Sequence, residues 1–128
     1  MTDGVEGITT AALGLALDAA SLRQQAIAAN VANANSIGYV PLTVSFEAQL
    51  DDARRALATQ GRLDGASLAG VQPRLEPVAV DAAGVPPKVL VDVEMASLAR
   101  NSVQYQALVK GLQRHYALLS AAIGEGKR

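Results

Sequence analysis

The sequence predicts a mainly α-helical protein in which two long terminal helices form an α-helical coiled coil, with a short central helix and a loop or β-hairpin segment between them. Apolar residues recur in steps of four and three along both ends of the 128-residue chain, which is the spacing of a coiled-coil seam. Most prolines lie within residues 61–87, where they interrupt regular helices. We therefore divide the chain into an N-terminal coiled-coil helix (1–35), a central segment (36–90) and a C-terminal coiled-coil helix (91–128).

The N-terminal segment predicts a helix with two adjoining apolar lines. The first line is Ile8, Ala12, Leu15, Ala19, Leu22, Ala26 and Ala29, and the second is Leu13, Leu17, Ala20, Ile27 and Val31. One line suffices for one partner helix, so two lines indicate a helix enclosed by several neighbours. A buried helix in an ordinary bundle gives the same pattern. The helix should end near Asn33–Asn35, because asparagine tolerates the left-handed conformation that closes helices and Gly38 follows.

The central segment predicts a second helix followed by a stretch rich in proline and glycine. Ser45 is placed to cap a helix that continues to about Thr59. Its exposed face would carry pairs of opposite charge three and four residues apart, formed by Asp51, Asp52, Arg54 and Arg55. Further on, Leu75–Val80 favours a strand and Asp81–Gly84 favours a turn. We therefore expect a loop or a small hairpin within residues 61–87.

The C-terminal segment predicts a long helix with one unbroken apolar line, in which only Ser102 is polar. The line comprises Val91, Met95, Leu98, Ser102, Tyr105, Val109, Leu112, Tyr116, Leu119 and Ile123. The helix should end at Gly124–Gly126, before the basic pair Lys127–Arg128. Two such helices at opposite ends of a chain can pair antiparallel with each other or with the helices of other copies.

The composition restricts both the core and the surface. Half of the residues are hydrophobic, but only 3% are aromatic and tryptophan is absent. Much of the apolar material is alanine, which buries little area per side chain, so we expect an isolated monomer to be marginally stable. The net charge is −1 and no basic block exceeds two residues, which argues against nucleic-acid binding because that needs clustered Lys and Arg.

Residues that carry chemistry are few and scattered. His115 is the single histidine and cysteine is absent, so neither a nucleophile–histidine pair nor a metal site of the usual ligand types has enough partners. Asp51–Asp52 are adjacent on a helix and therefore point in different directions. No glycine-rich phosphate loop is present. We expect a protein that is not an enzyme, with no catalytic residues, no cofactor and no metal.

Export and membrane signals are also weak. The N-terminal MTDGVEG is acidic and lacks the basic region of a secretory signal. The uncharged stretch Gln24–Phe46 contains five Gln and Asn residues, which makes it a poor membrane span. We expect no direct membrane insertion, and any route out of the cytoplasm should need no cleaved signal peptide.

The sequence AIAANVANANSIGY at 26–39 resembles the signature of the bacterial flagellar rod, hook and hook-associated axial proteins. In that family an amphipathic N-terminal helix runs into an A-x-N-[IVL]-A-N-x-x-T-x-G-[YF] motif. The matching motif residues include Asn30, Ala32, Asn33, Gly38 and Tyr39. The chain departs from the family pattern at Ser36–Ile37, Val40 and Pro87–Lys88. The C-terminal region resembles one proximal rod protein of the family, at Glu94–Met95, Asn101, Tyr105–Leu108 and Ala122–Ile123.

The resemblance implies a structural subunit of the proximal rod of the flagellar basal body, in the periplasmic space, exported by the flagellar type III apparatus without a cleaved signal. Its implied partners are copies of itself, the other proximal rod proteins, the rod-base adapter, the membrane ring and the export gate. Two alternatives stay open: a sister proximal rod protein of similar size, and a helical-bundle adaptor or chaperone. We hypothesise an assembly seam completed by neighbouring subunits, formed by Leu15, Leu22, Ala26, Met95, Leu98, Tyr105, Leu112 and Leu119.

Overall fold

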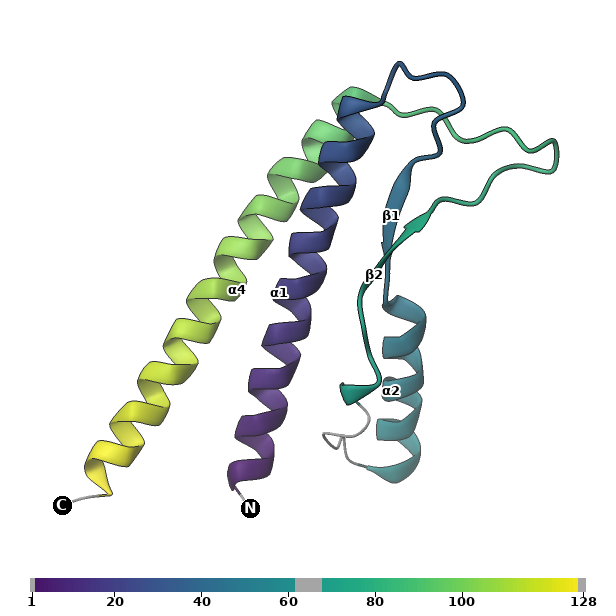
Figure 1. The fold of residues 1–128 in the computed structure, drawn as a ribbon. Helices are drawn as coiled ribbons and strands as arrows, with labels where there is room; N and C mark the ends of the chain where they lie inside the picture. The colour runs from purple at the N-terminus through teal and green to yellow at the C-terminus, as the bar shows by residue number, and fades with distance from the viewer. Residues whose placement is uncertain (1, 62–67, 127–128) are drawn as a thin grey trace.

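The computed structural model describes residues 2–61 and 68–126 (Figure 1). Along the chain its elements are α1 (Thr2–Ala32), β1 (Leu42–Ser45), α2 (Glu47–Gln60), β2 (Arg74–Pro77) and α4 (Val91–Glu125). The expected fold class is confirmed, because the chain is mainly helical, with two long helices near its ends and a shorter helix between them. Residues 62–67 of the predicted loop segment and the basic pair Lys127–Arg128 lie outside the described residues.

The end of α1 follows the expected asparagine chemistry. Asn33 Nδ2 donates to the carbonyl oxygen of Ala29 over 2.9 Å, and the N–H of Ser36 donates to the carbonyl of Asn33 over 2.9 Å. Gly38 then adopts a φ of 75°, a left-handed conformation that glycine reaches without a steric cost. The helix therefore closes where the sequence predicts, and the chain turns back toward β1.

Helices α1 and α4 lie side by side and run antiparallel (Figure 1). Asn101 Nδ2 donates to the carbonyl oxygen of Ala20 over 2.9 Å. Farther along, Leu13 Cδ2 lies 4.0 Å from the position that a Cβ would take on Gly111. Ala20 and Leu13 belong to the second apolar line of α1, so this line faces α4. Ala26, from the first line, and Ile27, from the second, line a pocket together with Leu42 of β1 and Glu94 of α4. Helix α1 therefore has both β1 and α4 as neighbours.

The side of α4 that packs on α1 only partly coincides with the predicted apolar line. Both share Leu98, Leu112 and Leu119, which are half-buried. The packed side also contains Glu94 and Asn101, because both find hydrogen-bond partners on α1. The other members of the predicted line lie on an adjacent side of the helix. Within one chain, therefore, α4 packs through part of its line, whereas Val91, Met95, Tyr105, Tyr116 and Ile123 stay exposed.

The central segment differs from the expectation in two respects. Ser45 does not cap α2: it is the last residue of β1, Phe46 precedes the helix, and no side chain caps the first turn. The turn at Asp81–Gly84 is present, since the N–H of Gly84 donates to the carbonyl of Asp81 over 2.9 Å. However, β2 does not pair across that turn.

The partner of β2 is β1, which precedes α2 in the chain. The two strands are antiparallel and align Leu42 with Pro77 and Ser45 with Arg74. The N–H of Val78 also donates to the carbonyl of Pro41 over 2.8 Å. The sheet therefore brings together segments that are separated by the whole of α2, and this long-range pairing has no signal in either short strand alone.

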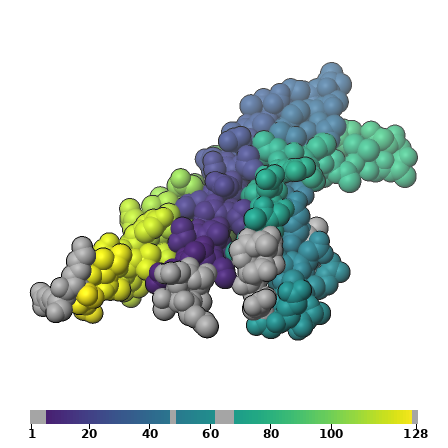
Figure 2. Space-filling view, turned by 60° about the horizontal axis from the view of Figure 1, so that its bottom comes forward, coloured from purple at the N-terminus to yellow at the C-terminus, as the bar shows by residue number. Residues whose placement is uncertain are grey.

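The buried apolar core is thin. Among the described residues it consists of Ala19, Ala20, Ala26 and Ile27 in α1, with Ala53, Leu68 and Val71 around α2. Four of these seven are alanines, which bury little area each. The C-terminal end of α4 projects to one side of the molecule (Figure 2). Within residues 2–61 and 68–126, no helix has both the length and the apolar composition needed to cross a membrane.

Candidate assembly site

Asn30 joins three parts of the chain at the end of α1 and is only 4% exposed. Its Oδ1 accepts from the N–H of Leu42 over 2.8 Å and from the Tyr39 hydroxyl over 2.8 Å. Its Nδ2 donates to the carbonyl of Leu42 over 3.0 Å and to Glu94 Oε2 over 3.4 Å. These four contacts use both donors and both acceptor positions of an amide. Asn30 thus connects the end of α1, the start of β1 and the first turn of α4.

Tyr39 lies beside the carboxylate that this junction contains. Partial burial away from water raises the pKa of the Tyr39 hydroxyl above its usual value of 10.0, and the negative charge of Glu94 raises this pKa further. The phenol therefore keeps its proton, which it donates to Asn30. Glu94 lies in the first turn of α4, where a negative charge is stabilised by the helix dipole.

The remaining motif residues have different positions. Asn33 closes α1 through its bond to Ala29, and Ala32 is the exposed last residue of the helix. Gly38 supplies the positive φ of the turn. Ile37 projects from this turn with its side chain fully exposed. The motif thus combines a buried anchor at Asn30 with an exposed turn.

A second buried amide lies in the middle of the α1–α4 interface. Asn101 is 3% exposed, and besides its bond to Ala20 it donates to Gln24 Oε1 over 3.2 Å and accepts from Arg23 Nη1 over 3.2 Å. We did not predict a site role for Asn101. Its neighbour Ser102 belongs to the predicted apolar line of α4. The Ser102 hydroxyl donates to the carbonyl of Leu98 in the same helix.

One side of α4 carries a row of exposed apolar side chains that we call the α4 stripe. Its members are Val91 (45% exposed), Met95 (49%), Tyr105 (43%), Tyr116 (50%) and Ile123 (63%). At 1.5 Å per residue the row extends over about 48 Å. No described element buries it. Exposed apolar side chains that are aligned along one side of a helix make a candidate interaction site, because a partner helix can cover them together.

The hypothesised assembly seam is divided between covered and uncovered positions. Ala26 is buried beside β1, and Leu15 and Leu22 on α1 are half-buried. On α4, Leu98, Leu112 and Leu119 are half-buried, whereas Met95 and Tyr105 belong to the exposed α4 stripe. The chain therefore brings part of the seam together and leaves the stripe available for another molecule.

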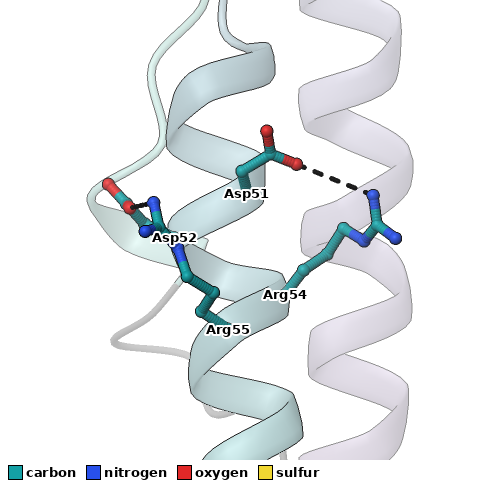
Figure 3. A network of polar contacts seen from close by, with 4 residues as sticks. All are labelled: Asp51, Asp52, Arg54 and Arg55. Carbon is teal, nitrogen blue, oxygen red and sulfur yellow. Dashed lines mark hydrogen bonds and ion pairs between the residues drawn. The ribbon is translucent and has the colours of Figure 1, made fainter.

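The charged face of α2 is solvated, as its spacing indicates. Arg54 pairs with Asp51 over 3.6 Å and Arg55 pairs with Asp52, with all four side chains at least 64% exposed (Figure 3). Exposed pairs of this type contribute less than about 1 kcal/mol to stability. We therefore assign this cluster no binding role.

His115 lies in α4 with its ring tilted against Tyr116 at a centroid distance of 6.2 Å. Its Nε2 is buried and has no hydrogen-bond partner among the residues that the structure describes. In the described parts of the chain, no three residues of the His, Cys, Asp and Glu types gather in an arrangement that could hold a metal ion. The amide junctions at Asn30 and Asn101 thus join α1 to α4, whereas the α2 ion pairs lie within a single helix.

Comparison with known proteins identifies no relative: no protein-family model matches the sequence, and no curated protein matches it. The functional argument therefore depends on the residues and on the surfaces described above.

Proposed function

We propose that this chain is a structural subunit of the proximal rod of the bacterial flagellar basal body, and that it is not an enzyme. Its terminal helices pack with those of neighbouring subunits to build the tubular drive shaft for motility. In its motifs it resembles the proximal rod protein FlgB. Its partners are copies of itself, the other proximal rod proteins, the rod-base adapter, the membrane ring and the export gate. It reaches the periplasmic rod without a cleaved signal peptide.

The observation that carries the proposal is the α4 stripe. A helix that packs only within its own chain turns its large apolar residues inward, whereas α4 leaves Met95, Tyr116 and Ile123 about half exposed or more. Their spacing continues the coiled-coil pattern, so a second helix can cover them over the whole length of α4. The chain therefore has the surface of a subunit whose packing is completed by assembly.

The junction at Asn30 supports the same proposal. The motif residues that carry the flagellar resemblance are Asn30, Asn33, Gly38 and Tyr39. In this structure they fix the end of α1, a tight turn and the first turn of α4 relative to one another. A rod transmits torque, so each subunit needs a rigid connection between its two long helices. The four contacts of Asn30 provide such a connection without a large apolar core.

The thin core distinguishes this proposal from a helical-bundle adaptor or chaperone. A self-sufficient bundle buries large side chains and melts cooperatively as a monomer. Here the buried apolar residues are mostly alanines, so we expect a monomer that melts broadly and whose apparent stability increases with protein concentration. Circular dichroism melts at several concentrations test this. A sharp transition that does not depend on concentration would favour the adaptor.

The proposal is tested by deleting the gene in its own bacterium, scoring swimming and imaging purified basal bodies by electron microscopy. We expect non-motile cells with membrane rings but no rod, rescued by the intact gene. The sister protein FlgC is the alternative within the same rod. Complementation of separate deletion strains of the two proximal rod genes decides between them, because each subunit occupies its own position.

Substitutions on α4 test the stripe itself. Tyr116→Asp should prevent rod formation, because it places a charge in the surface that a neighbour covers. Leu118→Asp is the matched control, since Leu118 is 60% exposed but lies about 160° farther round the helix. Both variants should keep the helicity of the purified monomer. Normal rods in the Tyr116→Asp strain would contradict the assembly role of the stripe.

A further inference from the structure

Asn101 occupies an unusual place for a polar residue, because it is the most buried side chain of α4. It is 3% exposed and faces the middle of α1. Its amide meets the carbonyl of Ala20 and the side chains of Arg23 and Gln24, at distances of 2.9, 3.2 and 3.2 Å. Both ends of the amide are therefore matched by groups on the other helix. A buried polar group of this type costs free energy if the pairing is lost.

The apolar packing next to Asn101 does little to fix how the two helices are aligned. Next to Asn101 it includes small residues of α1 such as Ala20 and Ser21, and farther along the helix pair Gly111 faces Leu13. Small side chains project little from a helix, so the packing surface of one turn is similar to that of the next turn. At these positions, a shift of one helix by seven residues would therefore cost little in apolar packing.

Such a shift changes the surroundings of Asn101 completely. In the observed alignment Glu94 meets Asn30, Asn101 meets Arg23, and Gly111 meets Leu13. Moving α4 by one heptad toward the start of α1 would bring Glu94 to Arg23, where the opposite charges could still pair. The same movement would place Asn101 among apolar residues, namely Leu13, Ala16 and Leu17. Asn101 would then lose both side-chain partners.

We infer that Asn101 determines the register in which α4 pairs with α1, and so selects one alignment of these helices over the alignment shifted by a heptad. A single buried asparagine has this effect in coiled coils, where it selects one register because the others leave its amide unpaired. The inference concerns the two helices of one chain, so it does not depend on the proposed place of the protein in the rod.

The register can be measured with pairs of introduced cysteines, because the natural sequence contains none. Leu13→Cys with Gly111→Cys reports the observed register, since these positions are in contact. Glu6→Cys with Gly111→Cys reports the register shifted by seven residues. Each pair is treated with a short thiol-specific crosslinker at low protein concentration, and the fraction crosslinked within one chain is measured by mass spectrometry.

In the natural background we expect the first pair to react and the second to react only weakly. Asn101→Leu should increase the yield of the shifted crosslink relative to the observed one by roughly tenfold or more, because the shifted state no longer buries an unpaired amide. Asn101→Ala should act in the same direction with a smaller side chain. Ser102→Leu is the matched control and should leave the ratio unchanged, because Ser102 bonds only within its own helix.

Three results would overturn the inference. The first is an unchanged crosslinking ratio in both Asn101 variants. The second is an equal increase in the Ser102→Leu control, which would assign the effect to added apolar area. The third is loss of helicity by circular dichroism in both Asn101 variants, which would mean that Asn101 is needed to form the helix pair and does not choose between two registers.

Discussion

The side-chain amide of Asn30 pairs with the backbone of Leu42 as a residue of a neighbouring strand would. Its oxygen accepts from the N–H of Leu42 over 2.8 Å, and its nitrogen donates to the carbonyl of the same residue over 3.0 Å. This double exchange is the pattern of a hydrogen-bonded pair in an antiparallel sheet. A single helical side chain therefore holds the outer edge of β1 against α1, on the opposite side of the strand from β2.

Replacing Asn30 should consequently destabilise the monomer. Asn30→Leu keeps a similar volume but leaves both backbone groups of Leu42 unpaired in a partly buried place. We expect a loss of about 1–3 kcal/mol in the free energy of unfolding, measured by urea denaturation followed by circular dichroism. Asn35→Leu is the control, since Asn35 is exposed in the following turn. Equal stability of the two variants would show that the pairing with Leu42 contributes nothing.

Tyr39 should make stability depend on pH in the alkaline range. Burial, and then the Glu94 carboxylate, raise the pKa of Tyr39 above 10.0 in the folded chain. The folded state thus holds this proton more tightly than the unfolded state. Its contribution to stability is complete below pH 10.0 and is lost as the pH rises through the folded-state pKa.

Tyr39→Phe isolates this contribution because it removes only the hydroxyl. We expect the variant to lose about 0.5–1.5 kcal/mol at neutral pH, the usual contribution of one hydrogen bond, and to lose stability less steeply than the natural chain at high pH. Urea denaturation on both sides of pH 10.0 provides the comparison. Parallel pH profiles for the two proteins would exclude Tyr39 as the source of the dependence.

Local chemistry explains why the helix ends could be predicted from the sequence. Asn33 closes α1 through groups within its own turn, and Gly38 takes the positive φ that the turn requires. The start of α4 at Val91 also agrees with the predicted line. These features depend on residues close together in the chain, so a single sequence contains the relevant information.

Long-range contacts explain where the structure differs from the sequence-based predictions. Ser45 has the composition of a helix cap, but pairing of β1 with β2 places it in a strand opposite Arg74. Asn101 was overlooked as a site because an apolar pattern treats polar residues as solvent-facing. Its burial depends on Arg23 and Gln24, which lie on the other helix. In both cases the deciding partner is distant in sequence and its position cannot be read from local spacing.

The turn after α1 provides a test of backbone strain without steric contact. Apart from Gly38 itself and its two chain neighbours, no described atom lies within 4 Å of the position that a Cβ would occupy on Gly38, but its φ is +75°. Gly38→Val should therefore destabilise the chain by about 1–2 kcal/mol through the backbone alone and impair rod assembly. Gly38→Asn is the matched variant, because asparagine tolerates this conformation. If thermal denaturation shows the two variants to be equally stable, the turn adopts another conformation in solution.

The hypothesised assembly seam leads to a prediction about Leu15 and Leu112, which are half-buried on α1 and α4. In the proposed rod their remaining exposed area is covered by a neighbouring subunit, so an aspartate at either position would place a charge in that contact. We expect Leu15→Asp and Leu112→Asp to be expressed but absent from purified basal bodies, as detected by immunoblotting. Leu15→Met and Leu112→Met conserve volume and hydrophobicity and should be incorporated. If either aspartate variant is incorporated into rods at natural levels, that residue does not belong to the assembly seam.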